Sequence, residues 1–161
     1  MRKSSKGFSL IELLIVVAII LIIAAIAIPN LLRSRIAANQ ASAVGSLRTL
    51  NTAEITYSST YNVGFTATMT NLQPPTTAGA NPTSTATGLI DSVLALGSKS
   101  GYSFLYSAGT ADSTGRINTY AFTGSPITSS TGTNYYYTDQ SGVIRQNSTT
   151  TAGSTDSPIA G

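Results

Sequence analysis

Residues 6–28 read KGFSLIELLIVVAIILIIAAIAI, and this stretch decides how the chain is organised. From Phe8 to Ile28 the side chains are apolar except for those of Ser9 and Glu12. At a rise of about 1.5 Å per residue, a helix of this length measures about 31 Å, close to the ~30 Å hydrocarbon core of a bilayer. The stretch therefore predicts a helix that spans a membrane once.

The charges that flank this stretch predict its orientation. Arg2, Lys3 and Lys6 precede it, and no cation follows until Arg33. The positive-inside rule places the basic N-terminus in the cytoplasm and the body of the chain outside. The same three cations account for the formal net charge of +3, because the other basic residues balance the acids. The body therefore has no basic excess that would favour a specific nucleic acid as a partner.

Three simpler interpretations of the stretch were weighed. A secretory signal peptide has a shorter apolar region and a small-residue cleavage site after it, whereas Pro29-Asn30-Leu31 follows here. A buried core helix fits poorly because the run is aliphatic on every face. A plain membrane anchor fits the length and the flanks but gives no reason for Glu12.

A charged Glu12 inside a membrane is unfavourable in free energy, so it needs a partner that neutralises it. It lies four residues after Phe8, which is one helical turn. If the chain is cut after Gly7, the new amine of Phe8 could neutralise Glu12 of the same or a neighbouring subunit. Pairing between subunits would make the charge a register for assembly.

The segment from Lys6 to Ile20 resembles the class III signal of type IV pilins and type II secretion pseudopilins, with a Gly, an aromatic residue, a Glu at the fifth position after the cut and a long aliphatic run. The resemblance implies that a prepilin peptidase cuts after Gly7 and methylates the new N-terminus at Phe8. It also implies that Glu12 pairs with the N-terminal amine of an adjacent subunit, and that the region around Pro29 unwinds during assembly. The close match covers about the first 60 residues.

Pro29 lacks a backbone donor, which predicts a kink or local melting of the helix at this point. Beyond it, apolar residues recur at helical spacing up to about Ser59. This predicted stripe consists of Ile36, Ala37, Ala43, Val44, Leu47, Leu50, Ala53 and Tyr57. We therefore expect an amphipathic continuation of the helix with one face packed on a sheet.

The second half of the chain predicts a small polar head. An irregular connection with three prolines is followed by a short amphipathic helix around residues 89–96. Turn signals such as Asp139-Gln140-Ser141-Gly142 separate four strand-like pieces. These pieces are Tyr102–Ala108, Ile117–Thr123, Tyr135–Thr138 and Val143–Gln146. The fold class is α+β and pilin-like, with a long N-terminal helix, transmembrane in its first half and amphipathic in its second, packed on an antiparallel sheet of three or four strands.

The expected organisation is a leader at residues 1–7, a hydrophobic helix at 8–29, its amphipathic continuation at 30–60 and a head at 61–161 that ends in a Ser/Thr-rich tail. Without Cys the head cannot close its C-terminal loop with a disulfide, as many pilins do, so its sheet, its packing or subunit contacts must hold it.

Enzymatic activity is not expected. The chain contains neither His nor Cys, and its acids are scattered. Asp139 and Asp156 could contribute to a calcium site, as in some pseudopilins, but are more simply turn residues. No cofactor or metal is predicted. Asn147-Ser148-Thr149 is a formal glycosylation sequon of a kind that occurs often by chance.

These observations predict the major structural subunit of a type IV pilus, serving adhesion, motility or DNA uptake. The subunit would wait in the inner membrane, lose its leader to a prepilin peptidase, and be polymerised by the pilus assembly machinery into an extracellular homopolymer. A pseudopilin of a type II secretion system is the nearest alternative. A monomeric, membrane-anchored adhesin or binding module is a further one, and it predicts an uncut leader.

Overall fold

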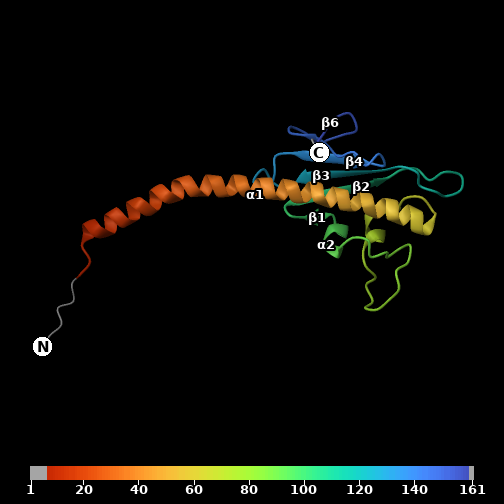
Figure 1. Ribbon diagram of the computed structural model, residues 1–161, viewed down its shortest axis with the longest axis horizontal. Helices are drawn as coiled ribbons and strands as arrows, with labels where there is room; N and C mark the ends of the chain where they lie inside the picture. The colour runs from red at the N-terminus through yellow and green to blue at the C-terminus, as the bar shows by residue number, and fades with distance from the viewer. Residues whose placement is uncertain (1–6, 160–161) are drawn as a thin grey trace. The chain divides into compact units, whose positions relative to one another are not determined.

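A computed structural model of the protein describes residues 7–159 (Figure 1). The chain divides after Arg35 into two units, residues 1–35 and residues 36–161. Helix α1, Leu10–Tyr61, begins in the first unit and ends in the second. The predicted long N-terminal helix is therefore confirmed, and it ends two residues beyond the predicted Ser59.

Five of the eight residues in the predicted apolar stripe of α1 are buried: Ala43, Leu47, Leu50, Ala53 and Tyr57. Val44 and Ile36 are half-buried, and Ala37 is exposed, so the stripe begins later than predicted. Leu47 and Leu50 are fully inaccessible and share a core with Tyr102 and Phe122 of the sheet. Burial of such side chains contributes about 1.5–3 kcal/mol each, and it fixes the second half of α1 on the head.

The head contains one antiparallel sheet of six strands, in which each strand pairs with the next along the chain. The strands are β1 (Ser98–Lys99), β2 (Tyr102–Ala108), β3 (Tyr120–Pro126), β4 (Tyr135–Asp139), β5 (Arg145–Asn147) and β6 (Ser157–Pro158). The α+β class and the helix-on-sheet arrangement are confirmed. The strand number was underestimated because β1 and β6 have two residues each, too few to give a periodic signal.

The third strand begins later than the predicted Ile117–Thr123. Ile117 lies instead in the β2–β3 connection, where it makes isolated bridges with Gly64 and Ala111. The buried alternation that defines β3 starts at Tyr120 and continues through Phe122 and Gly124. In the same way, Val143 belongs to the turn before β5 and not to the strand.

Two short helices cover the edge of the core. The 3-10 helix η1 spans Met69–Leu72, and α2 spans Ser92–Ala95, which is shorter than the predicted helix around residues 89–96. Asp91 caps the N-terminus of α2 by accepting a hydrogen bond from the Leu94 amide. Gly97 ends it at a φ of +77°, where a Cβ would meet the Phe104 carbonyl oxygen at 2.8 Å. The two ends therefore limit α2 to a single turn.

Hydrogen bonds join the two ends of the irregular connection before α2. The Thr87, Gly88 and Leu89 amides donate to carbonyls of residues 71–73. These bonds leave the Pro- and Thr-rich residues between them as an exposed surface loop.

Candidate assembly site in the N-terminal segment

The predicted cleavage point lies outside α1. Residues 7–9 precede the helix, and the Phe8 side chain is 80% exposed. A Cβ added at Gly7 would meet no atom within 4 Å, and Gly7 does not have a positive φ. Neither packing nor backbone conformation in the described structure therefore requires glycine at position 7.

Glu12 lies in the first turn of α1, where its Oε2 accepts a hydrogen bond from the Ser9 backbone N–H at 2.8 Å. Ser9 precedes the first helical residue, so Ser9 and Glu12 occupy the N-cap and N3 positions of a capping box. A carboxylate here also interacts favourably with the positive end of the helix dipole. The sequence signal for this role is Ser-x-x-Glu ahead of an apolar run, which the sequence analysis did not use.

The helix cap explains a glutamate at position 12 even if the segment is only a membrane anchor and forms no pair with another subunit. The carboxylate satisfies one of the donors that the helix start leaves unpaired. A cut after Gly7 would place a cationic amine on Phe8, directly before the residue that already donates to Glu12. The cap and the predicted ion pair would use the same carboxylate, and they can be separated because a glutamine can cap the helix but carries no charge.

Pro29 remains inside a continuous helix. Helical residues extend on both sides of it, so the predicted local melting is not present in this structure. Its missing N–H leaves the carbonyl of Ala25 without its usual helical donor. One turn later, the Ser34 hydroxyl donates to the Asn30 carbonyl at 3.0 Å. The predicted unwinding at Pro29 during assembly stays a prediction.

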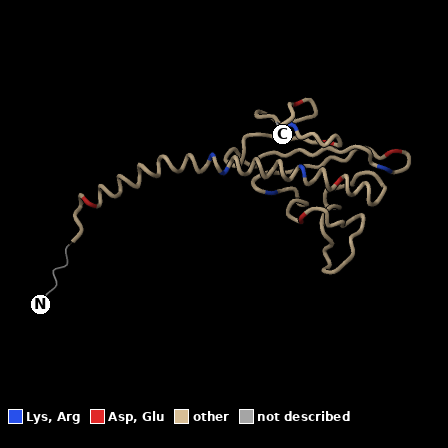
Figure 2. Tube along the Cα trace, in the orientation of Figure 1, with Lys and Arg blue, Asp and Glu red and all other residues tan. Residues whose placement is uncertain are grey.

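Between Leu13 and Ile28 the first unit displays a continuous apolar surface. Among the described residues, α1 is long and apolar enough to cross a membrane, and its most apolar window has a mean hydropathy of 3.3 with no buried residue. In the sequence no charged residue follows Glu12 until Arg33. Figure 2 shows this separation, with red near the start of α1 and blue further along the helix. Such a surface requires lipid or other protein around it.

The two acids of the calcium hypothesis have other partners. The Asp139 carboxylate accepts from the Ser141 amide at 2.9 Å, as expected for a turn residue. Asp156 accepts from the Asn147 side-chain amide at 3.0 Å and from the Gly153 amide at 2.7 Å. Within residues 7–159 no three His, Cys, Asp or Glu residues gather where they could hold a metal ion.

Asp156 instead closes the C-terminal loop without a disulfide. Its backbone carbonyl also accepts from the Arg145 guanidinium at 2.9 Å, and the Ile159 amide donates to the Ile144 carbonyl. The Asn147 side chain forms hydrogen bonds through both its nitrogen and its oxygen, since its Oδ1 accepts from the Thr149 and Thr150 amides. The sequon asparagine is therefore a structural residue of this loop.

A buried carboxyl on α1 was not among the residues predicted from the sequence. Glu54 has no exposed surface and accepts hydrogen bonds from the Thr66 amide and the Thr66 hydroxyl. Burial raises the pKa of its carboxyl above the ordinary value, against the lowering effect of the bonds from Thr66. The signal was present in the spacing, because Leu47, Leu50, Glu54 and Tyr57 follow one another at intervals of three and four residues.

Comparisons with known proteins find similarity in the N-terminal segment of the chain. Residues 2–28 match the prokaryotic N-terminal methylation motif. The chain is 65% identical over 37 residues to the type IV wide pilus major component PilA4 of Thermus thermophilus, a match that covers 23% of this chain and 28% of the relative. It is 52% identical over 50 residues to the type IV major pilin protein PilA of Myxococcus xanthus, covering 31% of this chain and 23% of the relative. No solved structure matches the chain.

The N-terminal segment therefore carries a prokaryotic N-terminal methylation motif. Over this segment the chain is similar to two major type IV pilins, which confirms the resemblance found in the sequence. The matches span about a quarter of the length of the two curated relatives.

Proposed function

We propose that the chain is the major structural subunit of an extracellular type IV pilus. The observation that carries this proposal is the exposed apolar stretch of α1, which bears one carboxylate in its first turn directly behind a cleavage motif. A filament core of such helices would bury this surface. The two relatives that share the segment are named as major pilus components.

The proposed mechanism has three steps. A prepilin peptidase cuts after Gly7 and methylates Phe8, which removes three of the cations and creates an N-terminal amine. The subunit waits in the inner membrane with its head outside. The helices then leave the lipid and pack together, with Glu12 of one subunit neutralised by the Phe8 amine of a neighbour.

The energetic reason for this pairing is the cost of an isolated charge in an apolar core. Apolar side chains gain little by exchanging lipid for other helices, so packing and charge pairing must drive the association. Leaving Glu12 unpaired among packed helices is destabilising by about 3–5 kcal/mol. That cost would select the register in which carboxylate and amine meet.

The test is assembly in a host that supplies a prepilin peptidase and a pilus assembly system. Wild-type chain and Glu12→Ala are expressed at matched levels, and surface filaments are sheared, collected and quantified. The proposal expects wild-type chain in the filament fraction and a loss of at least about tenfold for the variant, since 1.4 kcal/mol corresponds to tenfold. Equal amounts of both chains, found in the membrane fraction alone, would instead support an anchored monomer.

A further inference from the structure

The second unit contains a buried acid that the proposed filament mechanism does not use. Glu54 is buried on the core side of α1, about two turns before the helix ends at Tyr61. The next segment, residues 62–66, lies between α1 and the β2–β3 connection. The Phe65 amide donates to the Ile117 carbonyl at 2.7 Å, and the Arg116 guanidinium donates to the Asn62 carbonyl at 2.7 Å.

Two sets of hydrogen bonds join α1 to this segment: the Asn62 amide donates to the Ser58 carbonyl at 3.0 Å, and Thr66 donates to Glu54. The Glu54 Oε2 accepts from the Thr66 amide at 3.0 Å, and its Oε1 is 2.5 Å from the Thr66 hydroxyl oxygen. Tyr106 of β2 completes the cluster, because its hydroxyl donates to the Thr66 carbonyl at 2.6 Å and lies 3.2 Å from the Thr66 hydroxyl oxygen. Both Glu54 and Thr66 have no exposed surface.

Three titratable groups face this carboxyl, and all are tyrosines. They are Tyr57 on α1, Tyr106 on β2 and Tyr120 on β3. Burial first, and the charge of Glu54 second, raise the pKa of each phenol above its ordinary value. In the described part of the chain the salt bridge joins Lys99 to Asp91, and no cation pairs with Glu54. Between acid and neutral pH, Glu54 is therefore the group of this cluster that changes charge.

The cluster satisfies its hydrogen bonds in both protonation states. With Glu54 charged, the Thr66 hydroxyl donates to Oε1. With Glu54 neutral, the proton on Oε1 is donated to the Thr66 oxygen, and the Thr66 hydroxyl turns to the Tyr106 oxygen, while Tyr106 still donates to the Thr66 carbonyl. Protonation thus breaks no bond, whereas ionisation places a buried charge without a counter-ion among the described residues, which is disfavoured.

We propose that Glu54 is a proton-operated latch, which holds the segment 62–66 firmly on α1 when it is neutral and loosens this segment when it is charged. In the open form Glu54 would meet water and ionise at its ordinary pKa near 4.3. Opening therefore releases a proton, and raising the pH favours it. The closed form is at its most stable below this ordinary pKa, and the extra stability is lost as the pH rises through the higher pKa of the closed form.

Amide hydrogen exchange on the full-length chain in detergent micelles measures this opening. After correction for the intrinsic pH dependence of exchange, protection of the Thr66 amide should fall by up to about tenfold per pH unit within that window and then level off. In Glu54→Gln, the side-chain amide can accept from the Thr66 N–H and donate to its hydroxyl, so protection should stay near the acid plateau of the wild type at every pH. Equal pH dependence in both chains would overturn the proposal.

A second measurement does not depend on the folding of that variant. Glu12 and Glu54 are the two glutamates of the chain, so in a Glu12→Gln background 13C-glutamate labelling reports on the Glu54 carboxyl alone. The latch requires its titration midpoint to lie above the ordinary value of about 4.3. A midpoint at or below that value would reject the latch and would leave the filament proposal untouched.

Discussion

The carboxylate of Glu12 accepts a hydrogen bond from the Ser9 backbone N–H at 2.8 Å, so the acid proposed to pair with a neighbouring subunit already caps its own helix. Two variants separate these roles. Glu12→Ala removes the cap and the charge, whereas Glu12→Gln keeps a side chain that suits the N3 position of a capping box and loses the charge alone.

If the ion pair drives assembly, both variants should lose filaments by at least about tenfold, because an unpaired amine would remain in the core. The measurement is the quantity of sheared filaments relative to the membrane pool. Normal filament yield from Glu12→Gln, with loss in Glu12→Ala, would mean that the cap matters for assembly and the charge does not.

Gly7 should be required for processing and not for folding. A Cβ at this position meets no atom within 4 Å, so Gly7→Val adds its first side-chain atom into open space. We expect the variant to accumulate in the membrane with its leader attached, while its head unfolds at the same temperature as the head of uncut wild type. Cleavage is read by mass spectrometry of the membrane fraction after co-expression with a prepilin peptidase, and efficient cutting of the variant would argue against this role.

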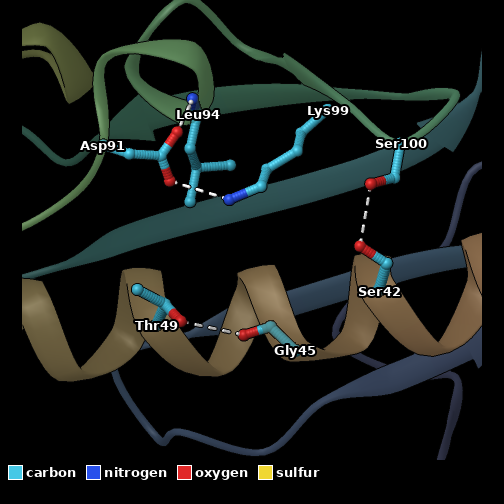
Figure 3. A network of polar contacts seen from close by, with 7 residues as sticks. All are labelled: Ser42, Gly45, Thr49, Asp91, Leu94, Lys99 and Ser100. Atoms are coloured by element: carbon cyan, nitrogen blue, oxygen red, sulfur yellow. Dashed lines mark hydrogen bonds and ion pairs between the residues drawn. The ribbon is translucent and has the colours of Figure 1, made fainter.

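Asp91 caps α2 and pairs with Lys99 at 2.8 Å (Figure 3). The hydrogen bond from Lys99, followed by the bond from the Leu94 amide, holds the pKa of this carboxyl below its ordinary value. Stability from this site is therefore present above the ordinary pKa of about 3.9 and is lost as the pH falls through the lower pKa of the folded state.

Asp91→Ala should reduce the free energy of unfolding of the head by about 1 kcal/mol at neutral pH through loss of the cap. Asp91→Asn is the matched control, since asparagine caps equally well and loses an exposed ion pair worth roughly 0–1 kcal/mol. Urea unfolding of the full-length chain in micelles, followed by tyrosine circular dichroism, compares the two. A larger loss in Asp91→Asn than in Asp91→Ala would contradict this ranking.

Asn51 sets the position of α1 on the sheet. Its side-chain amide donates to the Thr138 hydroxyl at 2.8 Å, and its oxygen accepts from the Tyr120 hydroxyl at 3.2 Å. Asn51→Ala leaves both buried hydroxyls short of a partner, and each such loss costs about 1–3 kcal/mol.

The same urea experiment should show a clear loss of stability for Asn51→Ala. Thr52→Ala, one residue away on the exposed side of α1, serves as the control and should change stability by no more than about 0.5 kcal/mol. Equally small changes in both variants would mean that the buried hydrogen bonds of Asn51 add little net stability, because alanine favours the helix at either position.

The helix and strand segments that were predicted correctly are those with a long periodic pattern of apolar residues. The apolar run, the stripe from Ala43 to Tyr57 and the strand Tyr102–Ala108 were all recovered, because each repeats its period over several residues. The two-residue strands β1 and β6 were missed because their existence depends on neighbours that are brought together by the fold. The start of β3 was misplaced because Ile117 is apolar yet pairs across the β2–β3 connection.

Polar residues that are buried inside an apolar pattern were not predicted from the sequence. Glu54 was counted among scattered acids, although it occupies a core position of the helical stripe. Its partner Thr66 lies in the connection after α1, where no periodicity marks it. The C-terminal closure through Asp156 likewise depends on contacts with Arg145 and Asn147 that the sequence does not predict.

The most direct test of the filament account is the intact mass and N-terminal sequence of the subunit in sheared surface filaments. The account predicts a chain of residues 8–161 that begins at Phe8 and carries one methyl group on its amine. A precursor that still begins at Met1, found in the membrane and not in filaments, would contradict it and favour a membrane-anchored binding protein.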